Sequence, residues 1–355
     1  MSLVALSHKM VAALAVALAA VAIGCGGGDD GGDRPKPVVL VTHDSFVLPD
    51  DLKRTFQRRT GRRLRILQTG DAGETLTKAL LTAGNPQGDV LFGIDSNLLS
   101  RALAVDLLVP YESPRLGRVP KRFVLDPQHR ALPVDHGEVC VNYDRAWFAE
   151  RDVAAPRSLD ELTDPSYRGL LVVQNPATST PGLAFLLATI AKYGEDGWQE
   201  YWRRLRENEV LVVDGWEEAY NVRFSGSAAG GGDHPLVVSY ASSPPAEVIF
   251  RTPRPRQAPT GVIEDSCFRQ IEFAGILRGT ENEEGARELI DFMLSPRFQE
   301  EVPLSMFVFP VMSGARLPPE FRFAVVPENP LELPPVTIEA SRDRWVKEWT
   351  SLVLR

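Results

Sequence analysis

The chain has 355 residues, of which 44% are hydrophobic and 24% charged, and its formal net charge is −8. This composition is that of a globular protein, and it excludes a largely disordered chain and a protein with many membrane spans. The acidic balance argues against a protein that binds nucleic acid without regard to sequence, because such a protein needs a basic face to neutralise phosphates. The length allows two or three domains with their own cores.

The first 24 residues have the pattern of an export signal. The apolar run Met10–Ala22 is too short for a membrane span, and it ends in small residues directly before Cys25. A cysteine in this position resembles the lipobox of bacterial lipoproteins, where it is acylated and becomes the mature N-terminus. We therefore expect residues 1–24 to be a signal peptide, Cys25 to carry lipid, and residues 25–37 to form a flexible tether. The alternative is a plain secretory signal with an incidental cysteine.

From residue 38 onward, short apolar strands alternate with amphipathic helices. The first unit has expected strands at 38–42, 64–67 and 89–94, and expected helices at 49–60 and from the turn at 70–73 to residue 81. The second unit has expected strands at 138–144, 170–173, 209–213, 236–240 and 267–273, and expected helices starting at 158 and 180 and spanning 198–208, 215–224, 282–294 and 342–354. This alternation predicts an α/β protein with parallel sheets and crossover helices.

Acidic side chains follow the predicted strands of the first unit. Asp44 comes after the first strand together with His43, Asp71 comes after the second strand, and Asp95 comes after the third strand. Ligands of open parallel sheets bind outside the carboxyl ends of the strands, so these residues are candidates to bind a cation or hydrogen-bond donors. The alternative is that each aspartate caps the helix that follows it.

The second unit offers hydroxyl and aromatic side chains at the same positions. Thr178, Ser179 and Thr180 lie where a helix is expected to begin, which favours an anionic or hydroxyl group on the ligand. Trp216 and Tyr240 lie at or just after strand ends, where an aromatic ring can stack on a flat or cationic ligand. The alternative for both aromatic residues is packing in the core.

Two cysteines remain after Cys25, namely Cys140 and Cys267. An even pair in an exported protein suggests a disulfide. Two buried free thiols are the alternative. A metal site is not expected, because neither cysteine belongs to a zinc-like spacing of cysteine and histidine.

Several of these segments resemble the thiamine-binding substrate-binding proteins of ABC importers. The resemblance is carried by residues 42–46, 89–99, 178–183, 215–220 and 239–240, and similarity runs from Val38 to Val311. It implies the type II periplasmic-binding fold, in which two lobes are joined by crossing strands and close on the ligand about a hinge. The implied lobes are residues 38–135 with 268–318 and residues 136–267, followed by a C-terminal extension at 319–355 that ends in a helix. Cys140 and Cys267 would then form a disulfide where the strands cross.

The resemblance also implies roles for individual residues. Asp71 would face the cationic thiazolium or the aminopyrimidine of thiamine, and Trp216 would stack on it. Residues 178–180 would meet the hydroxyethyl group or its phosphate. The expected ligand-binding set is His43, Asp44, Asp71, Asp95, Thr178, Ser179, Thr180, Trp216, Tyr220, Tyr240 and Phe307. His43 and Phe307 stand where better-known enteric members carry Tyr and Trp, and Ala246 stands where they carry a further Tyr.

The expected function is that of an extracytoplasmic lipoprotein that captures thiamine or its phosphates and delivers them to the permease of an ABC importer. Other binders of a small cation are the alternatives: Fe(III), although the adjacent tyrosine pair typical of ferric binders is absent because Ala241 follows Tyr240, or an organic amine or a phosphonate. An enzyme is the remaining alternative, but the sequence has no HExxH motif, P-loop or GxSxG motif. We expect no cofactor, no bound metal and no nucleic-acid partner.

Overall fold

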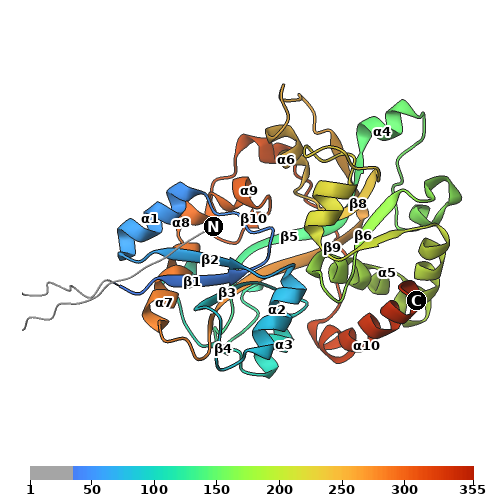
Figure 1. The fold of residues 1–355 in the computed structure, drawn as a ribbon. Coiled ribbons are helices and arrows are strands. Elements are labelled where there is room, and N and C mark those ends of the chain that lie inside the picture. Colours follow the sequence, from blue (N-terminus) through green and yellow to red (C-terminus); the bar gives the residue numbers. More distant parts are fainter. Residues whose placement is uncertain (1–34) are drawn as a thin grey trace, which may run out of the picture. The chain divides into compact units, whose positions relative to one another are not determined.

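The structure is a computed structural model that describes residues 35–355. The expected signal peptide and Cys25 lie outside the described residues. The described strands form one mixed sheet in the order β2-β1-β3-β9-β5-β8-β6-β7, with β10 paired to β5 and β4 paired to β9 (Figure 1). The α/β class predicted from the alternating pattern is therefore correct.

The strands and helices have the following bounds. The strands are β1 Val38–Thr42, β2 Leu64–Gln68, β3 Val90–Asp95, β4 Leu108–Val109, β5 Leu132–Asp144, β6 Leu171–Gln174, β7 Leu211–Val213, β8 Leu236–Tyr240, β9 Thr260–Leu277 and β10 Phe309–Pro310. The α-helices are α1 Asp50–Thr60, α2 Ala72–Leu81, α3 Leu99–Ala104, α4 Arg145–Glu150, α5 Thr180–Glu207, α6 Pro244–Ile249, α7 Glu283–Met293, α8 Pro296–Gln299, α9 Val302–Ser305 and α10 Pro335–Val353.

The two ends of the sheet are parallel, and the middle is antiparallel. We call β2-β1-β3 the first half of the sheet, where β1 pairs in parallel with both neighbours. We call β8-β6-β7 the second half, where β6 pairs in parallel with both neighbours. The long strands β5 and β9 run antiparallel between the halves, as Figure 1 shows. The strands expected at 138–144 and 267–273 are therefore parts of two longer strands that join both halves.

A bulge interrupts the pairing of β5 with β9. Val139 pairs with Phe268 and Val141 pairs with Ile263, so Cys140 alone faces four residues of β9. The Oγ of Ser266, inside the bulge, accepts a hydrogen bond from the Val141 backbone N–H at 2.7 Å and donates one to the Ile263 carbonyl at 2.6 Å. The bulge therefore interrupts the regular pairing of β5 and β9 within the length of both strands.

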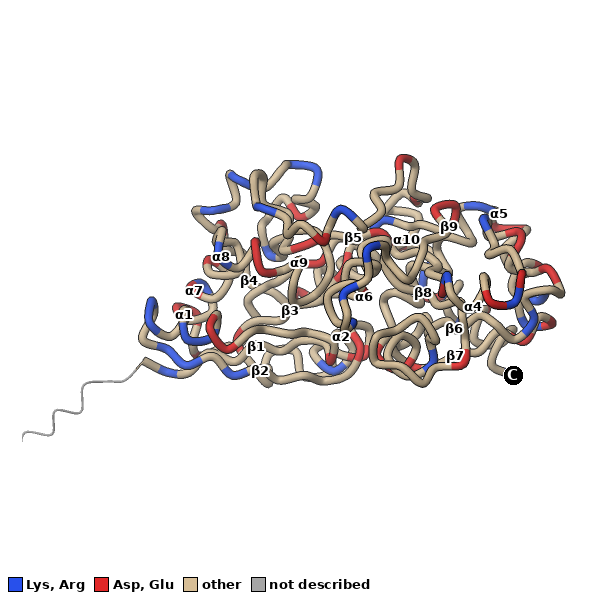
Figure 2. The backbone as a smooth tube through the Cα atoms, turned by 90° about the horizontal axis from the view of Figure 1, so that it is seen from above, with Lys and Arg blue, Asp and Glu red and all other residues tan. Residues whose placement is uncertain are grey.

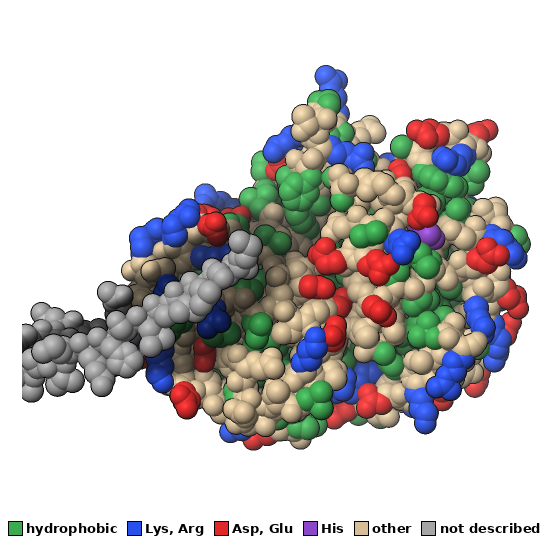
Figure 3. All heavy atoms as spheres, in the orientation of Figure 1, with side chains coloured by type: hydrophobic (Ala, Val, Ile, Leu, Met, Phe, Trp, Pro, Cys, Tyr) green, Lys and Arg blue, Asp and Glu red, His purple; other side chains and the backbone are tan. Residues whose placement is uncertain are grey.

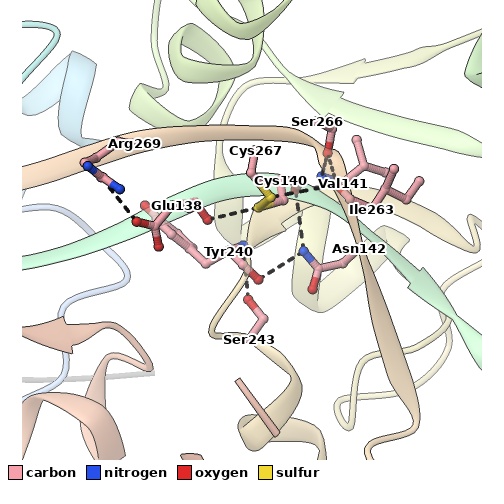
Figure 4. Close-up of a disulfide and its surroundings, with 10 residues drawn as sticks. All are labelled: Glu138, Cys140, Val141, Asn142, Tyr240, Ser243, Ile263, Ser266, Cys267 and Arg269. Carbon is pink, nitrogen blue, oxygen red and sulfur yellow. Dashed lines mark hydrogen bonds and ion pairs between the residues drawn. A yellow bond between two sulfur atoms is a disulfide. The ribbon is translucent and has the colours of Figure 1, made fainter. Parts of the chain in front are cut away.

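The expected disulfide lies at this bulge. Cys140 and Cys267 are bonded, with their Cα atoms 4.2 Å apart, and both side chains are fully buried (Figure 4). The bond links β5 and β9 where the two strands cross. The prediction that these two cysteines pair is therefore correct.

Helix α5 joins two helices that were expected separately. Gly194 has a φ of 71°, which interrupts the helical backbone between the expected segments at 180 and at 198–208. Ser179, rather than Thr180, is the residue at the N-cap of α5. The helix expected at 215–224 is a π-helix over Glu218–Arg223, a form that often occurs at functional sites.

The C-terminal helix α10 packs against α5 and begins earlier than the expected residue 342. The fully buried rings of Trp202 on α5 and Trp349 on α10 meet edge to face, with centroids 5.3 Å apart. Arg342 of α10 reaches the segment after β3, where its Nη1 donates to the Asn97 carbonyl at 3.1 Å and to the Ser100 Oγ at 3.2 Å. Helix α10 therefore contacts both α5, which follows β6 of the second half, and the segment that follows β3 of the first half.

The basic residues of α1, which lie between Lys53 and Arg59, are far from the middle of the sheet (Figure 2). In Figure 2 the basic positions of α1 lie beside β2, away from β5 and β9. Arg62, just after α1, is buried and pairs with Glu284 at 2.6 Å and Glu288 at 2.7 Å. Within residues 35–355, no helix combines the length and the apolar character needed to cross a membrane.

Candidate functional site

A cavity of about 630 Å³ lies between elements of the two halves of the sheet. The loop after β1 and the start of α2 contribute one part of its wall, and the start of α5, the segment after β7 and the loop after β8 contribute another. The segment that follows α9 closes it. Seven of the eleven residues expected to bind the ligand line this cavity: His43, Asp71, Thr180, Trp216, Tyr220, Tyr240 and Phe307.

Asp71 joins segments from opposite sides of the cavity. Its Oδ1 accepts a hydrogen bond from the Thr180 backbone N–H at 3.2 Å, and its Oδ2 accepts one from the Trp216 backbone N–H at 3.0 Å. Nearby, the Glu74 backbone N–H donates to the Thr178 carbonyl at 3.0 Å. Burial raises the pKa of the Asp71 carboxyl to about 6, although both backbone N–H groups oppose the rise. Asp71 therefore occupies the N-terminus of α5.

Two stacked aromatic rings form one wall of the cavity. The Trp216 and Tyr220 rings lie 4.9 Å apart at an interplanar angle of 13°. Trp216 Nε1 donates a hydrogen bond to the Ser239 Oγ at 3.0 Å, and the Tyr220 hydroxyl donates one to the Glu247 Oε1 at 2.9 Å. The polar atoms of both rings are bound by the protein, so their orientation is fixed before any ligand arrives.

Further aromatic side chains lie across the cavity. Phe307 has a φ of 56°, which is uncommon for a residue with a Cβ, and its ring meets that of Phe250 edge to face at 5.5 Å. Sparsely populated backbone conformations of this kind cluster at ligand sites. His43 lies 2.8 Å from the Ser45 Oγ through its Nδ1, and burial lowers its pKa to about 4, so the ring is neutral at pH 7.

The other four expected residues do not line the cavity. Asp95 is fully buried and accepts hydrogen bonds from the backbone N–H groups of Asn97 and Leu98, so it holds the turn before α3. Asp44 is exposed. The Thr178 Oγ1 donates to the Asp214 carbonyl at 2.6 Å, and Ser179 is buried at the N-cap of α5.

Three glutamates in the cavity wall were not among the expected residues. Glu217 directly follows Trp216, and Glu247 lies on α6, which follows Tyr240. Glu272 lies within β9. A search restricted to loops after strands cannot find Glu272, because the residue belongs to the interior of a long strand. The position of this acidic residue between Ile271 and Phe273 was the available signal.

The charged groups that line the cavity are all acidic. They are Asp71, Glu217, Glu247 and Glu272, and no Lys or Arg of residues 35–355 belongs to the lining. Figure 3 shows Asp and Glu side chains gathered midway between the two ends of the sheet. The cavity therefore combines carboxyl groups with aromatic rings, an arrangement that favours a cationic aromatic ligand over an anion.

Sequence comparison identifies relatives along most of the chain. The model of the family described as bacterial extracellular solute-binding protein matches residues 85–336. The thiamine-binding periplasmic proteins of Salmonella typhimurium and Escherichia coli are each 30% identical to the chain over 326 residues, which cover 90% of this chain and 94% of each relative.

Structural comparison gives the same result for the fold. A solved structure titled periplasmic thiamin binding protein matches with a TM-score of 0.79 and 27% identity, and the match covers 91% of this chain and 97% of that chain. Iron-bound HitA from Pseudomonas aeruginosa matches with a TM-score of 0.70 at 18% identity, which shows the shared fold alone. The expected type II periplasmic-binding fold is therefore correct, and the chain belongs to the family of bacterial extracellular solute-binding proteins.

Proposed function

We propose that the protein captures thiamine or its phosphates outside the cytoplasm and delivers them to the permease of an ABC importer. The observation that carries the proposal is the cavity itself, in which every charged lining group is a carboxyl and the walls are aromatic. Thiamine is a permanent cation with two flat heteroaromatic rings, so it matches both properties. The relatives named for thiamine binding support the same ligand.

The cavity opposes the ferric alternative. Ferric binders of this fold typically use adjacent tyrosines, but here Ala241 follows Tyr240. Within residues 35–355, no group of three or more His, Cys, Asp or Glu side chains is placed to hold a metal ion. A cationic organic ligand needs neither adjacent tyrosines nor such a group.

Ligand capture involves closure of two lobes in this proposal. Residues 38–135 with 268–318 form one lobe and residues 136–267 form the other, with the C-terminal extension at 319–355. The bulge of β9 opposite Cys140 separates two stretches of regular pairing, so bending concentrates there. The hydrogen bonds from Thr180 and Trp216 to Asp71 then hold the closed arrangement.

The protein acts at a membrane in this proposal, anchored through lipid on Cys25. Such an anchor keeps the protein beside its permease on the outer face of the cytoplasmic membrane. The Cys25→Ser variant is expected to leave the membrane fraction after cell fractionation. A variant that stays in the membrane fraction with the wild-type mature mass contradicts the anchor.

Calorimetric titration tests the ligand. Thiamine, its monophosphate, its diphosphate and Fe(III) are titrated separately into the purified protein. We expect thiamine to bind and Fe(III) not to bind. Trp216→Ala is expected to weaken thiamine binding by about tenfold to a hundredfold, because a desolvated cation–π contact contributes about 2 kcal/mol.

The matched control is Trp147→Ala. Trp147 is a half-buried indole on α4 that does not line the cavity. It is expected to leave thiamine affinity unchanged. Equal affinity in the wild type and in Trp216→Ala removes the stacking role, and no heat with thiamine in the wild type refutes the ligand.

A further inference from the structure

Three carboxyl groups lie side by side across the strands beneath the cavity. Asp95 of β3 pairs in register with Glu272 of β9, and Glu272 pairs in register with Asp135 of β5. Directly paired residues of antiparallel strands project from the same face of a sheet. Glu272 is only 7% exposed and lines the cavity, whereas Asp135 lies behind it and is fully buried.

The two acids of β5 and β9 have no basic partner. Both carboxyl oxygens of Asp135 lack a hydrogen-bond donor among residues 35–355. Two adjacent buried carboxylates repel each other, so such a pair retains one proton. Burial together with the Glu272 carboxylate raises the pKa of Asp135 well above its usual value, and burial raises the pKa of Glu272 to about 7. Asp135 is therefore the acid of the pair that stays protonated, and Glu272 is the acid that ionises near pH 7.

The other acids of the cavity already have donors. The Asp71 oxygens accept backbone N–H groups, and Glu217 accepts a hydrogen bond from the Asn221 Nδ2 at 2.7 Å. Glu247 accepts the Tyr220 hydroxyl and lies 3.8 Å from the Arg251 guanidinium. Glu272 is thus the cavity acid whose partner is another acid.

We propose that Glu272 provides the negative charge for the cationic ligand, and that ligand binding releases a proton from Glu272 while its neighbour Asp135 stays protonated. This inference rests on the proposed function. The arriving cation stabilises ionised Glu272, so the O–H bond of protonated Glu272 breaks and the proton passes to the solvent. No oxidation or reduction takes place.

The neighbours of Glu272 make such a release favourable. The groups that face it are Asp135 on β5, Asp95 on β3, Asp71 before α2 and the Tyr240 phenol on β8. Each is an acid, so none supplies the positive charge that ionised Glu272 requires. The cationic ligand supplies it, and the proton is then no longer needed.

The affinity for thiamine is therefore expected to depend on pH. Protonation of Glu272 competes with the cation, so the dissociation constant at about pH 6 should be about tenfold larger than at about pH 8, one unit either side of the Glu272 pKa. Calorimetry at about pH 7 in two buffers of different ionisation enthalpy should detect the release of about half a proton per thiamine. An affinity that does not change with pH overturns the inference.

Three variants assign the released proton to Glu272. Glu272→Gln removes the charge, so we expect weaker binding without pH dependence. Asp135→Asn keeps a neutral donor beside Glu272, as protonated Asp135 does, so we expect the wild-type pH dependence to persist. Glu138→Gln is the matched control, because Glu138 is a buried acid of β5 that does not line the cavity, and the wild-type pH dependence should persist.

These outcomes separate the inference from the proposed function. If the Glu272→Gln variant retains the tenfold pH dependence, the inference is wrong, but the proposed binding of thiamine is not affected. No thiamine binding at any pH refutes the proposed ligand instead. In that case, carbon-13 NMR of the glutamate carboxyls in the free wild-type protein still tests the proton on Glu272: a Glu272 signal that titrates near pH 7 supports the inference, and one that titrates near the usual value for glutamate refutes it.

Discussion

Asp71 shows how one carboxylate binds two segments that are far apart in the sequence. It precedes α2, yet it accepts hydrogen bonds from the start of α5 and from the segment after β7. The N-terminus of a helix carries unpaired N–H groups and a partial positive charge, which stabilise a carboxylate there. The role of Asp71 therefore includes holding the two sides of the cavity together, in addition to its expected charge.

Replacement of Asp71 by Ala is expected to weaken thiamine binding by about tenfold to a hundredfold. The variant loses hydrogen bonds to a charged group, each of which contributes roughly 1.5–3 kcal/mol, on the two sides that must close on the ligand. Titration calorimetry gives the affinity. Asp44→Ala is the control, because Asp44 is exposed and outside the cavity, and it should bind as the wild type does. Equal losses in both variants would contradict a specific role for Asp71.

The sequence could not separate the three aspartates that follow strands. Asp44, Asp71 and Asp95 have the same local pattern, and both ligand binding and helix capping are compatible with it. In the structure Asp95 stabilises the turn before α3, Asp44 faces solvent, and only Asp71 reaches the cavity. The positions of the three side chains depend on how strands and helices from distant parts of the chain pack together. The local sequence does not contain that information.

Among the elements, the strands were predicted best. The expected bounds of the first strand and of the strand at 236–240 are those of β1 and β8. Strand β9 was underestimated because only residues 267–273 were expected, whereas the strand spans Thr260–Leu277. Its polar residues 264–266 interrupt the apolar pattern, and the structure shows that they form the bulge. Glu272 lies within the expected part of the strand and was missed because site residues were sought only in the loops after strands.

The disulfide between β5 and β9 should contribute strongly to stability. It joins residues 127 positions apart, and the chain-entropy relation gives about 5 kcal/mol for such a loop, while measured values are typically about 2–4 kcal/mol. We expect the double variant Cys140→Ser with Cys267→Ser to unfold at a lower urea concentration than the wild type. Wild-type protein treated with a reductant should show the same shift. An unchanged midpoint with an unchanged slope would contradict this contribution.

For the molecule as a whole, the buried acids predict an unusual dependence of stability on pH. Burial raises the pKa of Asp71, Asp95, Asp135, Glu247 and Glu272. Each folded-state pKa lies above the unfolded value, so each acid stabilises the fold at low pH, and this contribution is lost as the pH rises through about 6 to 7. His43 and His136 act oppositely, because burial lowers their pKa to about 4 and protonation favours the unfolded chain below about pH 6.5.

The five acids outnumber the two histidines, so the melting temperature without ligand is expected to be higher at about pH 5 than at about pH 7.5. Calorimetric melts at the two pH values provide the measurement. Glu272→Gln, which cannot ionise, should reduce the difference. A melting temperature that rises steadily from the lower to the higher pH would contradict the expectation that the buried acids outweigh the buried histidines.

The fold of the whole chain was predictable because two independent signals agreed. The alternating strands and helices gave the α/β class, and the resemblance in the loops gave the arrangement of two parallel ends joined by crossing strands. Helix α10 was expected as an element, but its packing on α5 through Trp349 and its contact with the segment after β3 through Arg342 could not be predicted. These contacts are made by side chains that the alternation pattern does not constrain.

The position of Asp71 has a consequence for selection between the vitamin and its phosphate esters. The N-terminus of α5 is where a phosphate group would be expected to bind, yet a carboxylate of the protein already occupies it. An ester must displace that carboxylate and then lie among lining groups that include no Lys or Arg of the described residues. Each added phosphate increases this repulsion, so affinity should fall from thiamine to the monophosphate and again to the diphosphate. The importer would then take up the free vitamin in preference to its phosphorylated forms.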